Sequence, residues 1–108
     1  MNTSRLFQKK TVFSFEVFPP KKTSSLGTVY RTLEQMRGLS PDFISVTYGA
    51  AGRGGGRTVE IASDVKNRYG IESVAHLPCV GLTKNDVLEA LASLKRNGIE
   101  NILALRGD

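Results

Sequence analysis

The chain has 108 residues, of which 40% are hydrophobic and 23% charged, a composition typical of one globular domain. No apolar stretch reaches the ~20 residues that a membrane-spanning helix needs, and the polar N-terminus lacks the apolar core of a secretion signal. A single cysteine, Cys79, excludes a disulfide framework or a cysteine-based metal cluster within the chain. We therefore expect a cytoplasmic protein without a bound metal or a membrane partner.

The net charge of +5 comes from basic residues that are scattered along the chain. No predicted helix collects them into a stripe, and few aromatic residues lie among them, so a nucleic-acid partner is not expected. The positive balance instead indicates a solvated surface or a small anionic cofactor.

Strand-like and helix-like segments alternate from the first residues onward. The aromatic and β-branched run Val12–Phe18 predicts a strand that ends at Pro19-Pro20. Apolar residues then recur every three or four positions up to Met36, which predicts a helix ending at a left-handed Gly38. The second predicted strand is Phe43–Tyr48.

The same alternation continues to the end of the chain. A glycine-rich loop, 49–56, matches neither the dinucleotide fingerprint nor the P-loop, and a second helix is predicted to start near Thr58. The third strand is Ser73–Leu77, and Thr83 with Asp86 forms a capping box before the third helix. The fourth strand is Ile99–Leu105.

A β-α-β-α-β-α-β order fits either a small open sheet or the first half of a (β/α)8 TIM barrel. We favour the barrel, because the chain stops at the polar residue that follows its fourth strand. Residues 1–108 are then expected to form the N-terminal half of a single catalytic barrel domain, about four strands and three helices of a longer protein.

Each predicted strand delivers one polar residue near its end. These residues are Glu16, Thr47, His76 and Asp108, separated by 31, 29 and 32 positions. Because the carboxyl ends of parallel strands meet at one edge of a sheet, this spacing predicts a catalytic rim. Strand alternation also predicts that Glu16 and Thr47 face the barrel interior, the latter together with Ser45. A lone histidine at a strand end is, however, also typical of a purely structural residue.

Glu16 is the only charged residue between Thr11 and Pro20. Burial among Phe13, Phe15 and Phe18 would favour the protonated carboxyl group and make it a proton donor near neutral pH. The alternative is a structural glutamate that is paired with a lysine or an arginine.

Four segments resemble, in order, the signatures of the methylenetetrahydrofolate reductase family. They are FSFEVFPPK (13–21), FISVTYGA (43–50), AHLPC (75–79) and NILALRGD (101–108). The resemblance implies a TIM-barrel enzyme with non-covalently bound FAD. With NADH or NADPH as co-substrate, such an enzyme reduces 5,10-methylenetetrahydrofolate to 5-methyltetrahydrofolate for methionine biosynthesis. It also implies a homo-oligomeric full-length protein.

The resemblance gives individual residues a role. Glu16 matches the general acid, Thr47 the residue on the nicotinamide and substrate side, and Asp108 an aspartate that contacts both flavin and folate. We therefore expect Glu16 and Asp108 to be catalytic, and both to bind substrate together with Thr47. The positions that match FAD contacts are Tyr48, Ala50, His76, Arg106, Gly107 and Asp108.

Two other functions fit the residues. One is a barrel enzyme without flavin that acts on a pterin or a phosphate ligand, and the other is a small non-enzymatic α/β binding module. In either barrel reading the 108-residue piece would expose an unpaired strand edge, so we expect it to be inactive alone.

Overall fold

A computed structural model describes residues 1–8, 10–20, 26–48 and 55–107 and places four parallel strands beside one another in chain order. The strands are β1 (Ser14–Val17), β2 (Phe43–Val46), β3 (Ser73–Pro78) and β4 (Asn101–Leu105). The helices are the 3₁₀ helix η1 (Thr3–Gln8), α1 (Gly27–Arg37), α2 (Gly55–Asn67) and α3 (Lys84–Arg96). The predicted α/β fold is confirmed, and it is consistent with the N-terminal part of a TIM barrel.

Local sequence signals account for the start of α3 and for the C-terminal ends of α2 and α3. Thr83 and Asp86 form the predicted capping box, in which the Thr83 hydroxyl accepts from the Asp86 amide and the Asp86 carboxylate accepts from the Thr83 amide. Gly70 and Gly98 follow α2 and α3 with φ of 69° and 77°, a left-handed conformation in which glycine has no steric penalty.

The end of α1 differs from the sequence prediction. Gly38 has φ −64° and remains in the right-handed region, whereas Ser40 takes the left-handed conformation with φ 52°. The amides of Leu39 and Ser40 donate to the carbonyls of Met36 and Arg37, so the helical winding continues past Gly38. The chain therefore reverses two residues later than predicted.

Several strands and helices also begin or end at residues other than those predicted. The first and second strands are shorter than predicted, because β1 covers only Ser14–Val17 and β2 ends at Val46. The fourth strand begins at Asn101 rather than Ile99, and α2 begins at Gly55 rather than near Thr58. These shifts leave the order of the elements unchanged.

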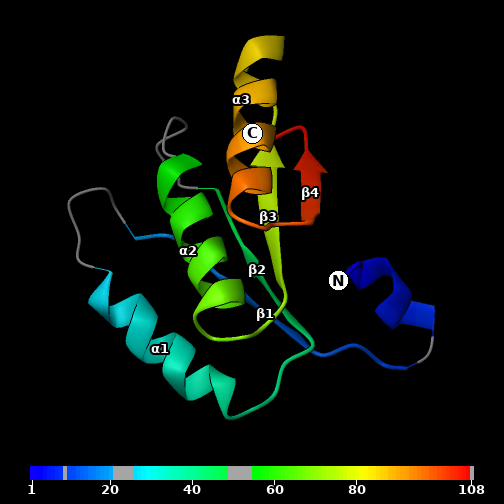
Figure 1. Ribbon diagram of the computed structural model, residues 1–108, viewed down its shortest axis with the longest axis vertical. Coiled ribbons are helices and arrows are strands. Elements are labelled where there is room, and N and C mark those ends of the chain that lie inside the picture. Colours follow the sequence, from blue (N-terminus) through cyan, green and yellow to red (C-terminus); the bar gives the residue numbers. More distant parts are fainter. Residues whose placement is uncertain (9, 21–25, 49–54, 108) are drawn as a thin grey trace.

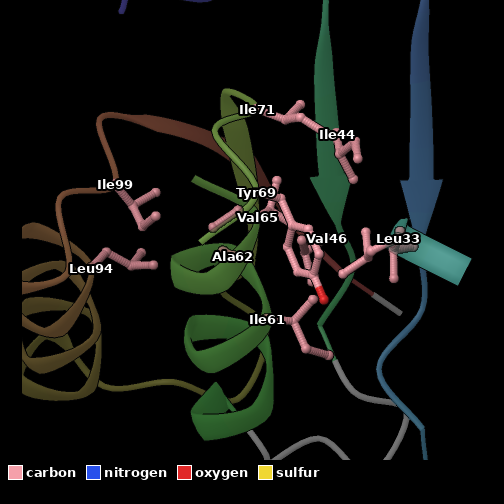
Figure 2. Close-up of a cluster of buried hydrophobic side chains, with 12 residues drawn as sticks. Leu33, Ile44, Val46, Ile61, Ala62, Val65, Tyr69, Ile71, Leu94 and Ile99 are labelled. Atoms are coloured by element: carbon pink, nitrogen blue, oxygen red, sulfur yellow. The ribbon is translucent and has the colours of Figure 1, made fainter. Parts of the chain in front are cut away.

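One hydrophobic core lies between the helices and one face of the sheet. Ile44 and Val46 of β2 are fully buried against Leu33 of α1 and against Ile61 and its neighbours on α2, as Figure 2 shows. The buried cluster as a whole comprises Val17, Leu33, Ile44, Val46, Ile61, Ala62, Val65, Tyr69, Ile71, Ala75, Leu94 and Ile99. In the described parts of the chain, no helix combines the length and the apolar character that crossing a bilayer requires.

The N-terminal segment lies on the other side of the strands from α1 and α2 (Figure 1). The Phe7 ring makes an edge contact with Phe43, the first residue of β2, at a centroid distance of 6.3 Å. Asn101 at the start of β4 accepts from the Thr3 amide at 2.9 Å and donates to the Met1 carbonyl at 2.7 Å. The sequence reading did not predict η1, which covers the amino end of the sheet.

Asp42 joins the start of β1 to the start of β2. Its carboxylate accepts from the Lys10 ammonium at 2.6 Å and from the Phe13 amide at 2.9 Å, and its own amide donates to the Phe13 carbonyl at 2.7 Å. The hydrogen bond from Lys10, followed by that from Phe13, holds the pKa of Asp42 below its usual value.

We predict that this carboxylate contributes to stability at neutral pH and that the contribution disappears in acid. Because the pKa of Asp42 is lower in the folded state, the stabilisation is complete above the unfolded value of about 4 and is lost as the pH falls through the folded one. Denaturant unfolding at a series of pH values should show Asp42→Asn less stable than the unmodified chain at pH 7, with the difference shrinking as the pH falls below about 4. Glu34→Gln, on an exposed face of α1, is the control. A constant difference across the pH range would contradict the prediction.

Candidate functional site

The face of the sheet opposite α1, α2 and α3 is called the helix-free face, because none of the described α-helices covers it. Glu16, Thr47 and His76, three of the polar residues that the sequence singled out, belong to this face by their position in the register. In a parallel sheet, paired residues point to the same side, and the register pairs Glu16 with Ser45 and Ser45 with Val74. Val46 pairs with Ala75, so Thr47 and His76, which follow them, lie one residue farther toward the carboxyl end. Glu16 is therefore level with Ser45 rather than with Thr47.

Glu16, Ser45 and His76 meet at one carboxylate oxygen. The Ser45 hydroxyl donates to Oε1 of Glu16 at 3.4 Å, and Nε2 of His76 lies 3.4 Å from the same oxygen. The imidazole is largely buried, with 12% of its side chain exposed, whereas 48% of the Glu16 side chain is exposed. Three neighbouring strands thus bring a carboxyl group, a hydroxyl group and an imidazole into one cluster.

The predicted burial of Glu16 among phenylalanines is wrong for the chain as it stands. Phe13 and Phe15 alternate with Glu16 along the strand, so they lie on the other face, where their rings contact each other at 4.9 Å. Phe18 is 68% exposed and does not cover the carboxylate. The alternative pairing with a lysine or arginine is not found among the described residues either, since the ionisable partner of Glu16 is His76.

The end of β2 is tied to the start of α2. The Thr47 amide continues the ladder by donating to the Val17 carbonyl at 3.0 Å, but the Thr47 carbonyl accepts from the buried Thr58 hydroxyl at 2.8 Å. This side-chain contact fixes the point where the strand stops pairing. Thr47 and the half-buried Tyr48 are held at the carboxyl edge as a result.

Arg106 and Gly107 continue beside the residues that follow β3. The Val80 amide donates to the Arg106 carbonyl at 2.8 Å. Gly107 has φ 89°, and a Cβ atom there would lie 2.9 Å from Cγ1 of Val80 and 3.0 Å from Cβ of Pro78. Glycine is required at this position both by its conformation and by the close approach of a neighbouring segment.

The structure therefore brings some of the predicted site residues together and leaves others apart. Glu16 and His76 are in contact, Thr47 lies near them in the register, and Tyr48, Arg106 and Gly107 follow the ends of β2 and β4. The other two predicted positions, Ala50 and Asp108, lie outside the described residues. Ser45 was not among the predicted site residues, although the alternation of β2 had already placed it on the same face.

Comparison with known proteins decides the family. The family described as methylenetetrahydrofolate reductase matches residues 2–108, almost the whole chain. The chain belongs to the methylenetetrahydrofolate reductase family. The four sequence segments that resemble this family overlap β1 to β4 and extend beyond the end of each strand.

Named relatives agree with this assignment. The chain is 40% identical over 99 residues to a probable methylenetetrahydrofolate reductase (NADH) of Oryza sativa subsp. japonica, covering 92% of this chain and 17% of the relative. It is 38% identical over 95 residues to the 5,10-methylenetetrahydrofolate reductase of Escherichia coli, covering 88% of this chain and 32% of that protein. The chain thus spans about a sixth to a third of the length of these members of the methylenetetrahydrofolate reductase family.

We predict that Gly107 of this methylenetetrahydrofolate reductase family chain is less tolerant of substitution than Gly81. Both have positive φ, but a Cβ atom at Gly81 would meet nothing within 4 Å. Gly81→Ala should cost about 1–2 kcal/mol of folding free energy from the backbone alone, and Gly107→Ala about 1–3 kcal/mol more from overlap with Val80 and Pro78. Equal losses in denaturant unfolding would show that this contact is not tight.

Proposed function

We propose that the protein reduces 5,10-methylenetetrahydrofolate to 5-methyltetrahydrofolate with NADH or NADPH, as one step of one-carbon metabolism and methionine biosynthesis. The observation that carries the proposal is the family match over residues 2–108, combined with a carboxylate that faces a buried imidazole on the carboxyl side of parallel strands. The names of the plant and bacterial relatives support the substrate. The cytoplasmic location and the homo-oligomeric state stay predictions from the sequence.

FAD is the proposed bound cofactor, and the residues at the carboxyl edge fit such a group. On the helix-free face, His76 pairs with Leu103 and Pro78 pairs with Leu105, which gives an imidazole beside partly exposed apolar side chains that suit a flat aromatic ring system. Arg106 supplies a cation for a diphosphate. We assign the binding of FAD to His76, Tyr48, Ala50 and the segment 106–108. When bound, the flavin supplies hydride transfer.

Glu16 is the proposed proton donor. Opening the five-membered ring of the substrate breaks a bond between the bridging carbon and a nitrogen, and the nitrogen leaves more easily once it is protonated. A carboxyl group on the open face can deliver that proton, because the Glu16 side chain is 48% exposed and therefore accessible to a ligand. Thr47 and Asp108, which follow strands on the same sheet, are assigned to the substrate, and Asp108 also to the flavin.

We further propose that residues 1–108 are the N-terminal half of one catalytic barrel domain. In support, β4 has a free edge in the described sheet and leaves Ile102 and Leu103 more than a third exposed. An apolar strand in this position is typical of one that pairs with a further strand. The proposed partners are then the folate, the nicotinamide and FAD, with neither nucleic acid nor membrane.

We predict that Glu16→Gln in the complete protein lowers the rate of folate reduction by at least about 100-fold, the usual contribution of a general acid. Glu89→Gln, on an exposed position of α3, should leave the rate unchanged. Product formation from methylenetetrahydrofolate and NADH or NADPH is the measurement, with the visible absorbance spectrum as a check for flavin. Folate reduction by a colourless protein would favour the barrel enzyme without flavin. No folate reduction at all would contradict the proposed function.

We also predict that the isolated 108-residue chain neither retains FAD nor oxidises reduced nicotinamide in turnover. The physical reason is that, under the proposed domain assignment, the other half of both ligand pockets comes from later strands. Gel filtration with FAD followed by an absorbance spectrum tests binding, and the decay of nicotinamide absorbance tests turnover. A yellow, active fragment would contradict the half-barrel assignment and support a self-sufficient module.

A further inference from the structure

We propose that Ser45 and His76 are positioning residues that hold one oxygen of Glu16 and leave the other oxygen to carry the transferred proton. This inference rests on the proposed function, because it specifies how the proton donor of that reaction is prepared. Neither role follows from the names of the relatives, and Ser45 was not among the residues predicted to form the site.

The geometry of the cluster distinguishes the two carboxylate oxygens. Both the Ser45 hydroxyl and Nε2 of His76 lie 3.4 Å from Oε1. Among the described residues, Oε2 of Glu16 has no hydrogen-bonding partner. A carboxylic acid carries its proton on one oxygen and accepts with the other. The Ser45 hydroxyl donates to Oε1 and the His76 imidazole lies beside the same oxygen, so Oε2 is the oxygen left to carry the proton.

Burial makes the two partners suitable for this role. The His76 side chain is 12% exposed and belongs to the central strand β3, and Ser45 lies on β2 between β1 and β3. Side chains on paired central strands have little freedom to move, which is what a precise site needs. Glu16, on the edge strand β1 and 48% exposed, is the member of the cluster that these two contacts must orient.

The proton transfer balances with these groups alone. The O–H bond at Oε2 breaks, and an N–H bond forms on the departing nitrogen of the substrate. Glu16 thereby becomes a carboxylate and gains a negative charge. The Ser45 hydroxyl donates to Oε1 and stabilises that charge, and a proton on Nε2 of His76, 3.4 Å from the same oxygen, would add to the stabilisation. Hydrogen bonds in active sites are often long in the absence of substrate and shorten when it is bound, which agrees with the distance of 3.4 Å between the Ser45 hydroxyl and Oε1.

The first arm of the test is kinetic and uses the complete protein. Ser45→Ala should lower kcat for folate reduction by about 10- to 100-fold, the range of one hydrogen bond to a charged group, without raising the KM for folate. In Ser45→Ala, the rate of nicotinamide oxidation with an artificial quinone acceptor should stay unchanged, because that reaction needs no proton from Glu16. Ser45→Thr keeps the hydroxyl and should restore the rate. Ser14→Ala removes an exposed hydroxyl from β1 and is the matched control.

The second arm is spectroscopic and needs no substrate or cofactor. His76 is the only histidine of the 108-residue chain, so its imidazole ¹H and ¹⁵N resonances are identified without ambiguity. Glu16→Gln and Ser45→Ala should both shift these resonances, because each alters the oxygen that His76 faces, whereas Ser14→Ala should not.

The two arms separate failure of this inference from failure of the proposed function. An unmodified chain whose imidazole resonances equal those of Glu16→Gln would overturn the positioning role, as would equal kinetic losses in Ser45→Ala and Ser14→Ala. Absence of folate reduction in the unmodified complete protein would instead contradict the proposed function, and the imidazole resonances would still show whether the three side chains share one oxygen.

Discussion

The parallel pairing of the four strands in chain order is the constraint on which the rest of the molecule depends. Each strand must cross back to the start of the next, and the helices that make these crossings cover the face that carries Ile44 and Val46. The residues that alternate with these two along the strands therefore point to the helix-free face. The contact between Glu16 and His76, whose strands are separated by β2, follows from that register.

Much of this arrangement follows from local sequence patterns. Leu33, Val65 and Leu94 belong to sets of apolar residues that recur every three or four positions, and all three are buried. The capping box of Thr83 and Asp86 fixes the start of α3. These signals involve residues close together in the chain, so the sequence displays them directly. The alternation of side chains along each strand was predictable for the same reason, whereas the strand ends were not, since β3 continues two residues beyond His76.

What could not be predicted depends on contacts between residues far apart in the chain. The pairing of β2 ends where the Thr47 carbonyl accepts from Thr58, and no propensity signal at Thr47 indicates this. Lys66 on α2 pairs with Glu72 at 3.2 Å and with Glu100 at 2.9 Å, and the hydrogen bond to Glu100 is the main cause that raises the pKa of Lys66. Such an interaction is visible only once the strands are placed.

The exposure of Glu16 shows how alternation outweighs composition. Three phenylalanines lie within three positions of this carboxylate, and composition alone therefore predicts an apolar pocket. Successive side chains of a strand, however, point to opposite faces, so Phe13 and Phe15 lie on the helix side and Glu16 lies on the helix-free face. The side chains that contact the Glu16 carboxylate, Ser45 and His76, then come from β2 and β3 rather than from its own strand.

The two ends of the helix-free face differ, and this difference bears on access. At the amino end, the contacts of Phe7 with Phe43 and of Thr3 with Asn101 place η1 against the sheet. At the carboxyl end stand the Glu16 and His76 side chains and, after β4, a glycine that approaches Pro78 and Val80 too closely for any side chain. One end is thus covered by the chain itself, while the other presents ionisable groups and bare backbone. The groups assigned to the reaction therefore lie at the carboxyl end, the side on which α/β enzymes place their chemistry.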